Sequence, residues 1–399
     1  MKSAFVVLLV LGLMLTGCQA ISKPPDKVNP GGTDLQPTLD SRIANMSLQE
    51  KVGQLLYIGL TENSLTTNQQ IISDLRPGGL ILFSRNFTTL DQTVAALNAY
   101  RQNSALVLPL FVGTDQEGGR ISRMPSTWAT KFPTAQKVGQ NSASARALAK
   151  AMGDELAALG FNMDFAPVLD VNSNPKNPVI GDRSYGSTPA VVWAAGQQVM
   201  AGLQDAKVIP VIKHFPGHGD TSVDSHKALP LITADKSLLE SRELKPFKDA
   251  IDALAPVVMV GHLLVPALDP DHPASLSQSV ITGLLREQWG YQELVVTDDM
   301  EMGAIAQDNI GEAAVQAVQA GADMLLVCHT YSQQQAVRDA LVAAVQSGRI
   351  SEERLNQSLT RILALKDKYQ VSKTAVSATD AHQVVGSVEH RNLVNSLGK

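Results

Sequence analysis

The stretch Ile209-Pro-Val-Ile-Lys-His214 decides the fold class, because an unbroken apolar run ends in two ionisable residues. Continuous rather than alternating apolar residues are typical of parallel strands that are buried on both faces. Similar short runs occur at 55–60, 80–83, 110–114, 161–166, 257–261, 294–297 and 324–328. Stretches with helical spacing separate them, at 89–103, 143–159, 189–204, 237–253, 277–289, 311–320 and 333–347. The sequence therefore predicts alternating strands and helices.

Eight strand–helix units predict an α/β fold, a single (β/α)8 or TIM barrel, which we place at residues 39–370. The alternative is an open, doubly wound sheet, but no Gly-x-Gly-x-x-Gly sequence follows the first strand. Ser47-Leu-Gln-Glu50 has the spacing of a helix capping box near the start of the domain. An amphipathic helix over 352–369 closes the domain, and we expect the polar C-terminal tail, 371–399, to pack loosely.

The composition excludes several classes of protein. With 44% hydrophobic residues among 399, the chain is too apolar to be disordered. A net charge of −5, with no long basic run and only 5% aromatic residues, argues against nucleic acid as a partner. Two cysteines cannot form a disulfide scaffold.

The N-terminus carries a targeting signal. The apolar run 4–15 is shorter than the ~20 residues of a spanning helix and has the length of a signal-peptide core. Leu15-Thr-Gly-Cys18 matches the bacterial lipobox, which predicts a lipoprotein signal peptide at 1–17 and a lipid on Cys18. Residues 18–38 then form a flexible tether to the membrane. We expect a location in the bacterial envelope, at the outer membrane of a Gram-negative host because Gln19 follows the cysteine. The alternative is an ordinary signal peptide with a chance cysteine.

Polar residues follow nearly every predicted strand. Because the carboxyl ends of the strands build the active site of such a barrel, these residues should collect on one rim. Desolvating many charged groups is costly unless they pair with one another or with a ligand. The strand ends carry Asp115-Gln-Glu117, Asp170, Lys213-His214, His262, Asp298-Asp299 and Cys328-His329.

Two of these groups have the character of reacting groups. Asp298 directly follows a strand, so we expect it to project into the barrel mouth as a nucleophile, with Asp299 supporting it. The alternative for this pair is capping of the next helix. Asp224-Ser-His226 places a carboxylate near an imidazole, which can orient the ring and stabilise its protonated form. The alternative is a surface loop with a solvated histidine.

A metal site is a further alternative, because His218, His226 and Asp224 could supply ligands. Lys213 beside His214 argues against it, since an ammonium group next to a divalent cation is unfavourable. We therefore expect no metal and no cofactor.

At this point the motifs resemble a known family. Lys213-His-Phe-Pro-Gly-His-Gly-Asp220 followed by Asp224-Ser-His226 is similar to the signature of family 3 glycoside hydrolases, in their β-N-acetylhexosaminidase branch. Asp115-Gln-Glu-Gly-Gly-Arg120, Gly181-Asp-Arg-Ser184 and Thr297-Asp-Asp-Met300 resemble other motifs of that family, in the same order. The resemblance covers roughly 45–370. It implies a carbohydrate substrate, with N-acetylglucosamine cleaved from peptidoglycan fragments or chitooligosaccharides.

The resemblance also implies roles for individual residues. Asp298 matches the nucleophile, His226 the acid/base and Asp224 its partner. Residues that match those binding the sugar hydroxyls are Asp115, Arg123, Arg183, Lys213 and His214. Glu117, His218 and His262 would support these groups from behind. We expect Gly217 and Gly219 to give the loop that carries His226 the freedom to close over substrate.

Departures from the family leave alternatives open. Many members have a second α/β domain, which in the glucosidase branch supplies the acid/base carboxylate; its absence here fits an acid/base on a barrel loop. Single-domain relatives in Gram-negative bacteria are generally cytoplasmic, whereas this chain has a lipobox. The alternatives are a β-glucosidase or β-xylosidase, an N-acetylglucosaminide phosphorylase, a metal-dependent hydrolase, and a non-catalytic lipoprotein that binds the cell wall. We expect a monomer.

Overall fold

The computed structural model describes residues 38–61, 64–221, 223, 225, 228–305 and 309–396. The predicted signal peptide, the tether up to residue 37 and Cys18 lie outside these residues. Asp224 and His226 also lie outside them. Within the described part of the chain, no helix is both long and apolar enough to cross a membrane.

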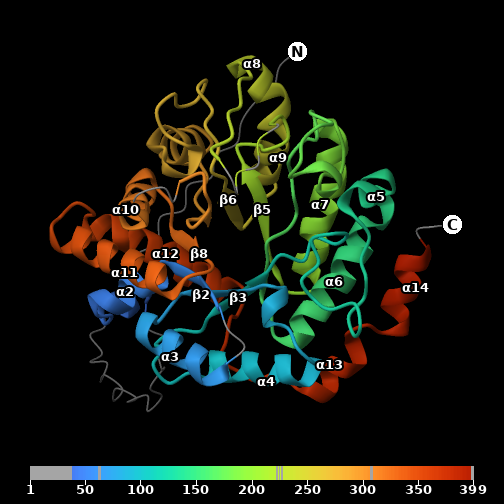
Figure 1. Cartoon of the computed structure of the whole chain (residues 1–399), viewed down its shortest axis with the longest axis horizontal. Coiled ribbons are helices and arrows are strands. Elements are labelled where there is room, and N and C mark those ends of the chain that lie inside the picture. The colour runs from blue at the N-terminus through green and yellow to red at the C-terminus, as the bar shows by residue number, and fades with distance from the viewer. Residues whose placement is uncertain are drawn as a thin grey trace, which may run out of the picture. The chain divides into compact units, whose positions relative to one another are not determined.

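Eight parallel strands form one closed barrel in the order β1 to β8, with β8 pairing back to β1. This arrangement confirms the (β/α)8 prediction, and the doubly wound alternative is wrong. Figure 1 shows the helices packed around the strands. The strands are β1 (Leu56–Gly59), β2 (Gly79–Leu82), β3 (Phe111–Thr114), β4 (Met163–Asp164), β5 (Ile209–Phe215), β6 (Val257–Val260), β7 (Leu294–Asp299) and β8 (Met324–Val327).

Helices follow the strands and bury one face against the barrel, as their amphipathic spacing predicts. The capping box expected at the domain start is present: the Ser47 amide donates to the Glu50 carboxylate at 2.8 Å, and the Glu50 amide donates to the Ser47 hydroxyl at 3.3 Å. The helices are α1 (Leu39–Ala44), α2 (Leu48–Gln54), α3 (Leu65–Leu75), α4 (Leu90–Arg101), α5 (Ala135–Gln140), α6 (Ala145–Leu159), α7 (Pro189–Asp205), α8 (Lys236–Leu238), α9 (Lys245–Asp252), α10 (Ile310–Ala320), α11 (Tyr331–Gln346), α12 (Glu352–Lys368), α13 (Ala378–Val384) and α14 (Val388–Ser396).

Shorter or wider helical turns complete the fold. The predicted helix at 237–253 is divided into α8, a π-helical turn and α9, and the predicted helix at 277–289 is π-helical. The 3-10 turns are η1 (Ser84–Asn86), η2 (Ser142–Ser144), η3 (Gly181–Arg183) and η5 (Ala274–Leu276), and the π-helices are η4 (Leu239–Glu243) and η6 (Ser279–Gln288).

The C-terminal tail is more ordered than its polarity suggested. It forms α13 and α14, which lie against α4 and α6 (Figure 1). Ala381 is fully buried there, and the Asn98 side chain exchanges two hydrogen bonds of 2.9 Å with the backbone of Val376. The expectation of loose packing is therefore wrong: a few well-placed hydrogen bonds and buried methyl groups hold a tail that is polar overall.

Candidate active site

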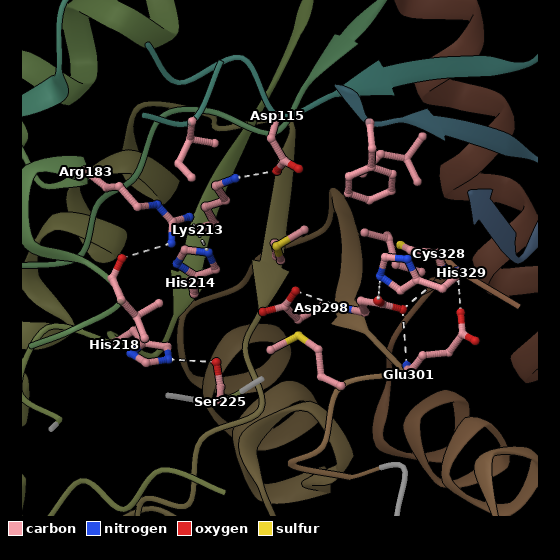
Figure 2. A pocket seen from close by; sticks show the side chains of 18 of the residues that line it. Asp115, Arg183, Lys213, His214, His218, Ser225, Asp298, Glu301, Cys328 and His329 are labelled. Carbon is pink, nitrogen blue, oxygen red and sulfur yellow. Dashed lines mark hydrogen bonds and ion pairs between the residues drawn. The ribbon is translucent and has the colours of Figure 1, made fainter. Parts of the chain in front are cut away.

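A cavity of about 240 Å³ lies at the carboxyl ends of the strands. This is just below the roughly 300–1,000 Å³ typical of ligand pockets, which suits a single small ring. Figure 2 shows the side chains that surround it. All six predicted site residues within the described part of the chain line this cavity, namely Asp115, Arg123, Arg183, Lys213, His214 and Asp298.

The strand pairing changes register at the two places that carry the key side chains. Between β5 and β6 the shift falls between Ile212 and Phe215, and between β7 and β8 it falls between Val296 and Asp299. Lys213, His214 and Asp298 lie inside these irregular stretches. Local irregularity in a ladder re-aims side chains, and it is common beside active sites.

Lys213 is the centre of one wall of the cavity. Its side chain is 2% exposed, and its ammonium group lies 2.7 Å from both the Asp115 and the Glu117 carboxylates. The other oxygen of Asp115 accepts from Arg123 at 3.0 Å. Burial alone would raise the pKa of Asp115, but the positive charges of Lys213 and Arg123 outweigh burial and hold that pKa well below its usual range. Asp115 is therefore an ionised acceptor at all ordinary pH values.

Glu117 lies behind Lys213 and also holds Arg183. The Arg183 guanidinium donates two hydrogen bonds of 2.8 Å to the two oxygens of Glu117. Burial would raise the pKa of Glu117, but Arg183 and Lys213 together lower it to about 2. Glu117 thus supports two of the predicted sugar-binding residues, as a paired, geometrically fixed carboxylate.

His214 is oriented by Asp170, a residue to which the sequence assigned no role. The His214 Nδ1 lies 2.7 Å from Asp170, and because a carboxylate can only accept, Nδ1 carries the proton. In the neutral ring, Nε2 is then an acceptor, and it lies 3.3 Å from the Arg183 guanidinium. Asp170 also accepts from the backbone amide of His218 at 2.7 Å. The available signal for Asp170 was its place just after the fourth predicted strand.

A second buried acid lies beneath this wall. Asp164, the last residue of β4, accepts from the Gln116 amide at 2.9 Å, and among the described residues its other oxygen has no hydrogen-bond partner. Burial raises the pKa of Asp164 well above its usual value, and the negative charges of Asp115 and Glu117 raise it further. The shift favours the neutral acid, and a neutral Asp164 adds no third negative charge beside Lys213.

The opposite wall carries Asp298 and Asp299 at the end of β7. The Asp298 carboxylate accepts from the Asp299 amide at 2.9 Å and points toward the middle of the cavity (Figure 2). Helix α10 begins only after Asn309, whose side chain caps it, so the alternative of Asp298 or Asp299 as the cap of that helix is wrong.

Asp299 is fixed from several directions. One of its oxygens accepts from the Cys328 amide at 3.1 Å, and the other lies 3.0 Å from His329 Nε2. Its backbone carbonyl accepts from His262 Nε2 at 2.9 Å, and Ser275 holds the other ring nitrogen of His262. Asp299 and His262 thus support the Asp298 segment, as expected. The part of His329 was not predicted, because its only signal in the sequence is its position just after the eighth predicted strand.

The loop after β5 begins firmly packed. Gly217 has a φ of +124°, and a Cβ on Gly219 would come within 1.6 Å of the Val171 carbonyl oxygen. The carbonyl oxygen of His218 accepts from Asn177 at 2.8 Å. Both glycines thus allow close packing at the base of the loop. Their expected part in closing the loop over substrate stays a prediction.

Further along this loop, Ser225 reaches the cavity wall. Its hydroxyl lies 3.1 Å from His218 Nε2. Burial lowers the pKa of His218 to about 4, so this ring is neutral near pH 7. The two neighbours of Ser225, Asp224 and His226, lie outside the described residues, and their roles stay predictions.

The described residues include no group of three or more His, Cys, Asp or Glu side chains arranged to hold a metal ion. The predicted metal alternative depended on Asp224 and His226, which the structure does not describe.

A closed (β/α)8 barrel with a small cavity of paired carboxylates and cations at its C-terminal rim is the architecture of an enzyme acting on a small polar ring. A family model described as "Glycosyl hydrolase family 3 N terminal domain" matches residues 47–365. The chain belongs to this family, in its β-hexosaminidase branch.

Relatives support this assignment. The chain is 35% identical over 355 residues to "Beta-hexosaminidase A" of Pseudoalteromonas piscicida, covering 82% of this chain and 59% of that protein. It is 36% identical to "Beta-hexosaminidase LpqI" of Mycobacterium tuberculosis, covering 81% and 84% of the two chains. A solved family 3 β-N-acetylglucosaminidase from Paenibacillus sp. FPU-7 is 42% identical with a TM-score of 0.82, covering 88% of this chain and 68% of that one.

Proposed function

We propose that this protein is a retaining, exo-acting β-N-acetylhexosaminidase that releases terminal N-acetylglucosamine from β-linked glycans such as peptidoglycan fragments or chitooligosaccharides. One observation carries the proposal: the Asp298 carboxylate faces, across a cavity of about 240 Å³, a fixed array of donors and acceptors around Lys213. The relatives named as β-hexosaminidases and as a β-N-acetylglucosaminidase supply the substrate class.

The first half of the reaction forms a glycosyl-enzyme. The Asp298 carboxylate attacks the anomeric carbon as the bond from that carbon to the leaving oxygen breaks. The imidazolium of His226 gives its proton to this oxygen, so the departing group leaves as a neutral alcohol. Asp224 stabilises the charged ring before the transfer.

The second half releases the sugar. A water molecule attacks the anomeric carbon from the side that the alcohol has left, His226 takes its proton, and the bond to Asp298 breaks. Two inversions give net retention. An imidazole has an ordinary pKa of about 6.5, so one ring can serve as acid and then as base near neutral pH. The contact of Ser225 with His218 supports a loop that reaches this cavity.

The wall around Lys213 binds the sugar hydroxyls. Asp115 is held ionised as an acceptor, while Lys213, Arg123 and Arg183 supply donors whose positions are already fixed by ion pairs. Preformed pairs of this kind reduce the entropy lost when the substrate is oriented over the nucleophile.

The test is a panel of nitrophenyl sugars with the product anomer followed by NMR. We expect the β-N-acetylglucosaminide to be cleaved much faster than the β-glucoside and β-xyloside, with the β-anomer appearing first. Inorganic phosphate should leave the product as free sugar; formation of a sugar 1-phosphate would instead establish a phosphorylase. An inverted first product would overturn the nucleophilic role of Asp298, and no cleavage of any sugar would favour a wall-binding protein.

We also propose that Cys18 carries a lipid that anchors the protein in the bacterial envelope. The lipobox Leu15-Thr-Gly-Cys18 supports this proposal. Expressed in a bacterial host, the full chain should enter the detergent phase of a Triton X-114 extraction, whereas Cys18→Ser should stay in the aqueous phase. Equal partitioning of the two forms would contradict the proposal.

A further inference from the structure

The segment after α12, residues 371–396, crosses the outside of the barrel and is bonded to α4 and α6; we call it the C-terminal clamp. Arg101 of α4 donates to the Thr374 carbonyl at 3.0 Å, next to the paired bonds of Asn98 with Val376. Further along, His382 of α13 forms an exposed ion pair of 2.9 Å with Asp91. These contacts hold the clamp to the barrel wall without touching the cavity.

One contact of the C-terminal clamp does reach toward the site. Glu155 of α6 is fully buried, and its Oε1 accepts from the Gly386 amide and from His390 Nδ1, both at 3.0 Å. Its other oxygen accepts from the Thr130 amide at 3.1 Å. A single carboxylate therefore joins the C-terminal clamp to the loop that runs from β3 to α5.

The same loop is in close contact with the clamp at Trp128. A Cβ on Gly386, which has a φ of +64°, would lie 2.1 Å from the Trp128 carbonyl oxygen. The Trp128 indole in turn donates to the Thr88 carbonyl at 3.0 Å. Only glycine, which has no Cβ atom, fits between the clamp and the loop at this position.

This loop carries a predicted sugar-binding residue. On its inner side, the loop is tied to the barrel at its start, because the Gln116 amide donates to Asp164 of β4 at 2.9 Å. The Gln116 side chain in turn accepts from the Arg123 amide at 2.8 Å. On its outer side, Glu155 and Gly386 hold Thr130 and Trp128. The backbone that presents Arg123 to Asp115 is therefore fastened from the inside by the barrel and from the outside by the C-terminal clamp.

We propose that the C-terminal clamp is a positioning element for substrate binding: through Glu155 it fixes the β3–α5 loop, and so sets how Arg123 meets the sugar. The proposal rests on the proposed function of the cavity. Removing the His390 donor leaves the Gly386 amide as the clamp's one remaining bond to Oε1 among the described residues. Loss of a hydrogen bond to a buried carboxylate is costly and favours movement of the loop toward a new partner.

The test uses His390→Ala in the full chain, with His382→Ala as a matched control. Both changes remove one histidine–carboxylate bond between the clamp and the barrel, but only the partner of His390 also holds the loop. We expect His390→Ala to raise KM for the nitrophenyl N-acetylglucosaminide roughly threefold to tenfold with kcat little changed. His382→Ala should leave both constants as they are.

Two further variants separate positioning from simple stability. His390→Asn keeps an N–H donor near the place of Nδ1, so it should restore KM. In an Arg123→Ala background, His390→Ala should add no further rise in KM, because the clamp acts through that residue. A fall in melting temperature with KM unchanged would overturn the proposal.

A readout independent of activity keeps this proposal separate from that of the function. In the wild type the Thr130 amide should exchange its hydrogen slowly, because it is bonded to a buried carboxylate. His390→Ala should speed exchange in residues 121–132, whereas His382→Ala should not. If His390→Ala speeds exchange in the loop but the wild type cleaves no sugar, the proposed function is refuted and the link from clamp to loop is retained. If His390→Ala leaves exchange in the loop unchanged, the link is refuted.

Discussion

The two walls of the cavity differ in how their charges are compensated. On the wall of β3, β4 and β5, Lys213 is buried and the Arg183 side chain is 10% exposed, and each has at least one carboxylate within 2.8 Å. On the wall of β7 and β8, Asp298 is only partly buried, and His329, which pairs with Asp299, is half-exposed. The first wall is preorganised to hold a neutral polar ring. Under the proposed function, the second places the Asp298 carboxyl group next to the carbon where positive charge develops in glycoside cleavage.

The largest expected effect falls on the second wall. Asp298→Ala removes the proposed nucleophile, so kcat for the nitrophenyl N-acetylglucosaminide should fall by at least roughly 10³-fold. Binding of N-acetylglucosamine, measured by calorimetry, should remain, because the Lys213 wall is untouched. Glu301 also lines the cavity and accepts from the Thr330 amide at 3.1 Å. Because Glu301→Gln keeps a side-chain oxygen that can accept this bond, it is the control and should keep most activity. If Asp298→Ala turns over substrate at the wild-type rate, the second wall does not supply the nucleophile.

The next effect falls on the first wall. Lys213→Met leaves the Asp115 and Glu117 carboxylates buried with no cation between them, which should lower the free energy of unfolding by about 3–5 kcal/mol. Urea denaturation measures it. Lys150→Met removes an exposed pair with Asp154 and should cost under about 0.5 kcal/mol. If the two variants lose the same unfolding free energy, burial does not strengthen the ion pairs of the first wall.

The pH dependence of stability sharpens the same comparison. Ionised Glu117, with its pKa lowered to about 2 from an ordinary value of 4.5, contributes stability above pH 4.5 that is lost as the pH falls toward 2. The wild type should therefore lose unfolding free energy in this window more steeply than Glu117→Gln. Acid titrations of both proteins, monitored by circular dichroism, give the two slopes. Parallel curves would contradict the lowered pKa.

The smallest effect belongs to His329. Its hydrogen bond to Asp299 raises its pKa above 6.5, so its contribution to stability is complete below pH 6.5 and is lost as the pH rises past the raised value. Because the ring is half-exposed, His329→Gln should cost under about 1 kcal/mol at pH 6 and less at pH 9. Thermal unfolding at the two pH values tests this. A cost that grows with pH would reverse the sign of the interaction.

Most of the fold could be predicted from the sequence, because strands and helices leave patterns among residues that are neighbours in the chain. Runs such as Leu294-Val-Val-Thr297 are apolar on both faces, and this pattern needs no knowledge of distant residues. The packing of the tail was not predicted for the same reason. Residues 371–396 are polar on average, and they are anchored by a few hydrogen bonds to Asn98, Arg101 and Glu155, which are distant in the sequence.

The sequence by itself determined the parallel strands and the order in which they occur along the chain. It also determined which ionisable side chains follow their carboxyl ends. The tertiary structure alone decided which of these groups meet. Lys213 and Asp115 are 98 residues apart in the chain, and Asp170 and His214 are 44 apart. Hydrogen bonds and ion pairs act over a few ångströms, so a pattern along the chain names the participants, while barrel closure and the shifts in strand register determine the partners.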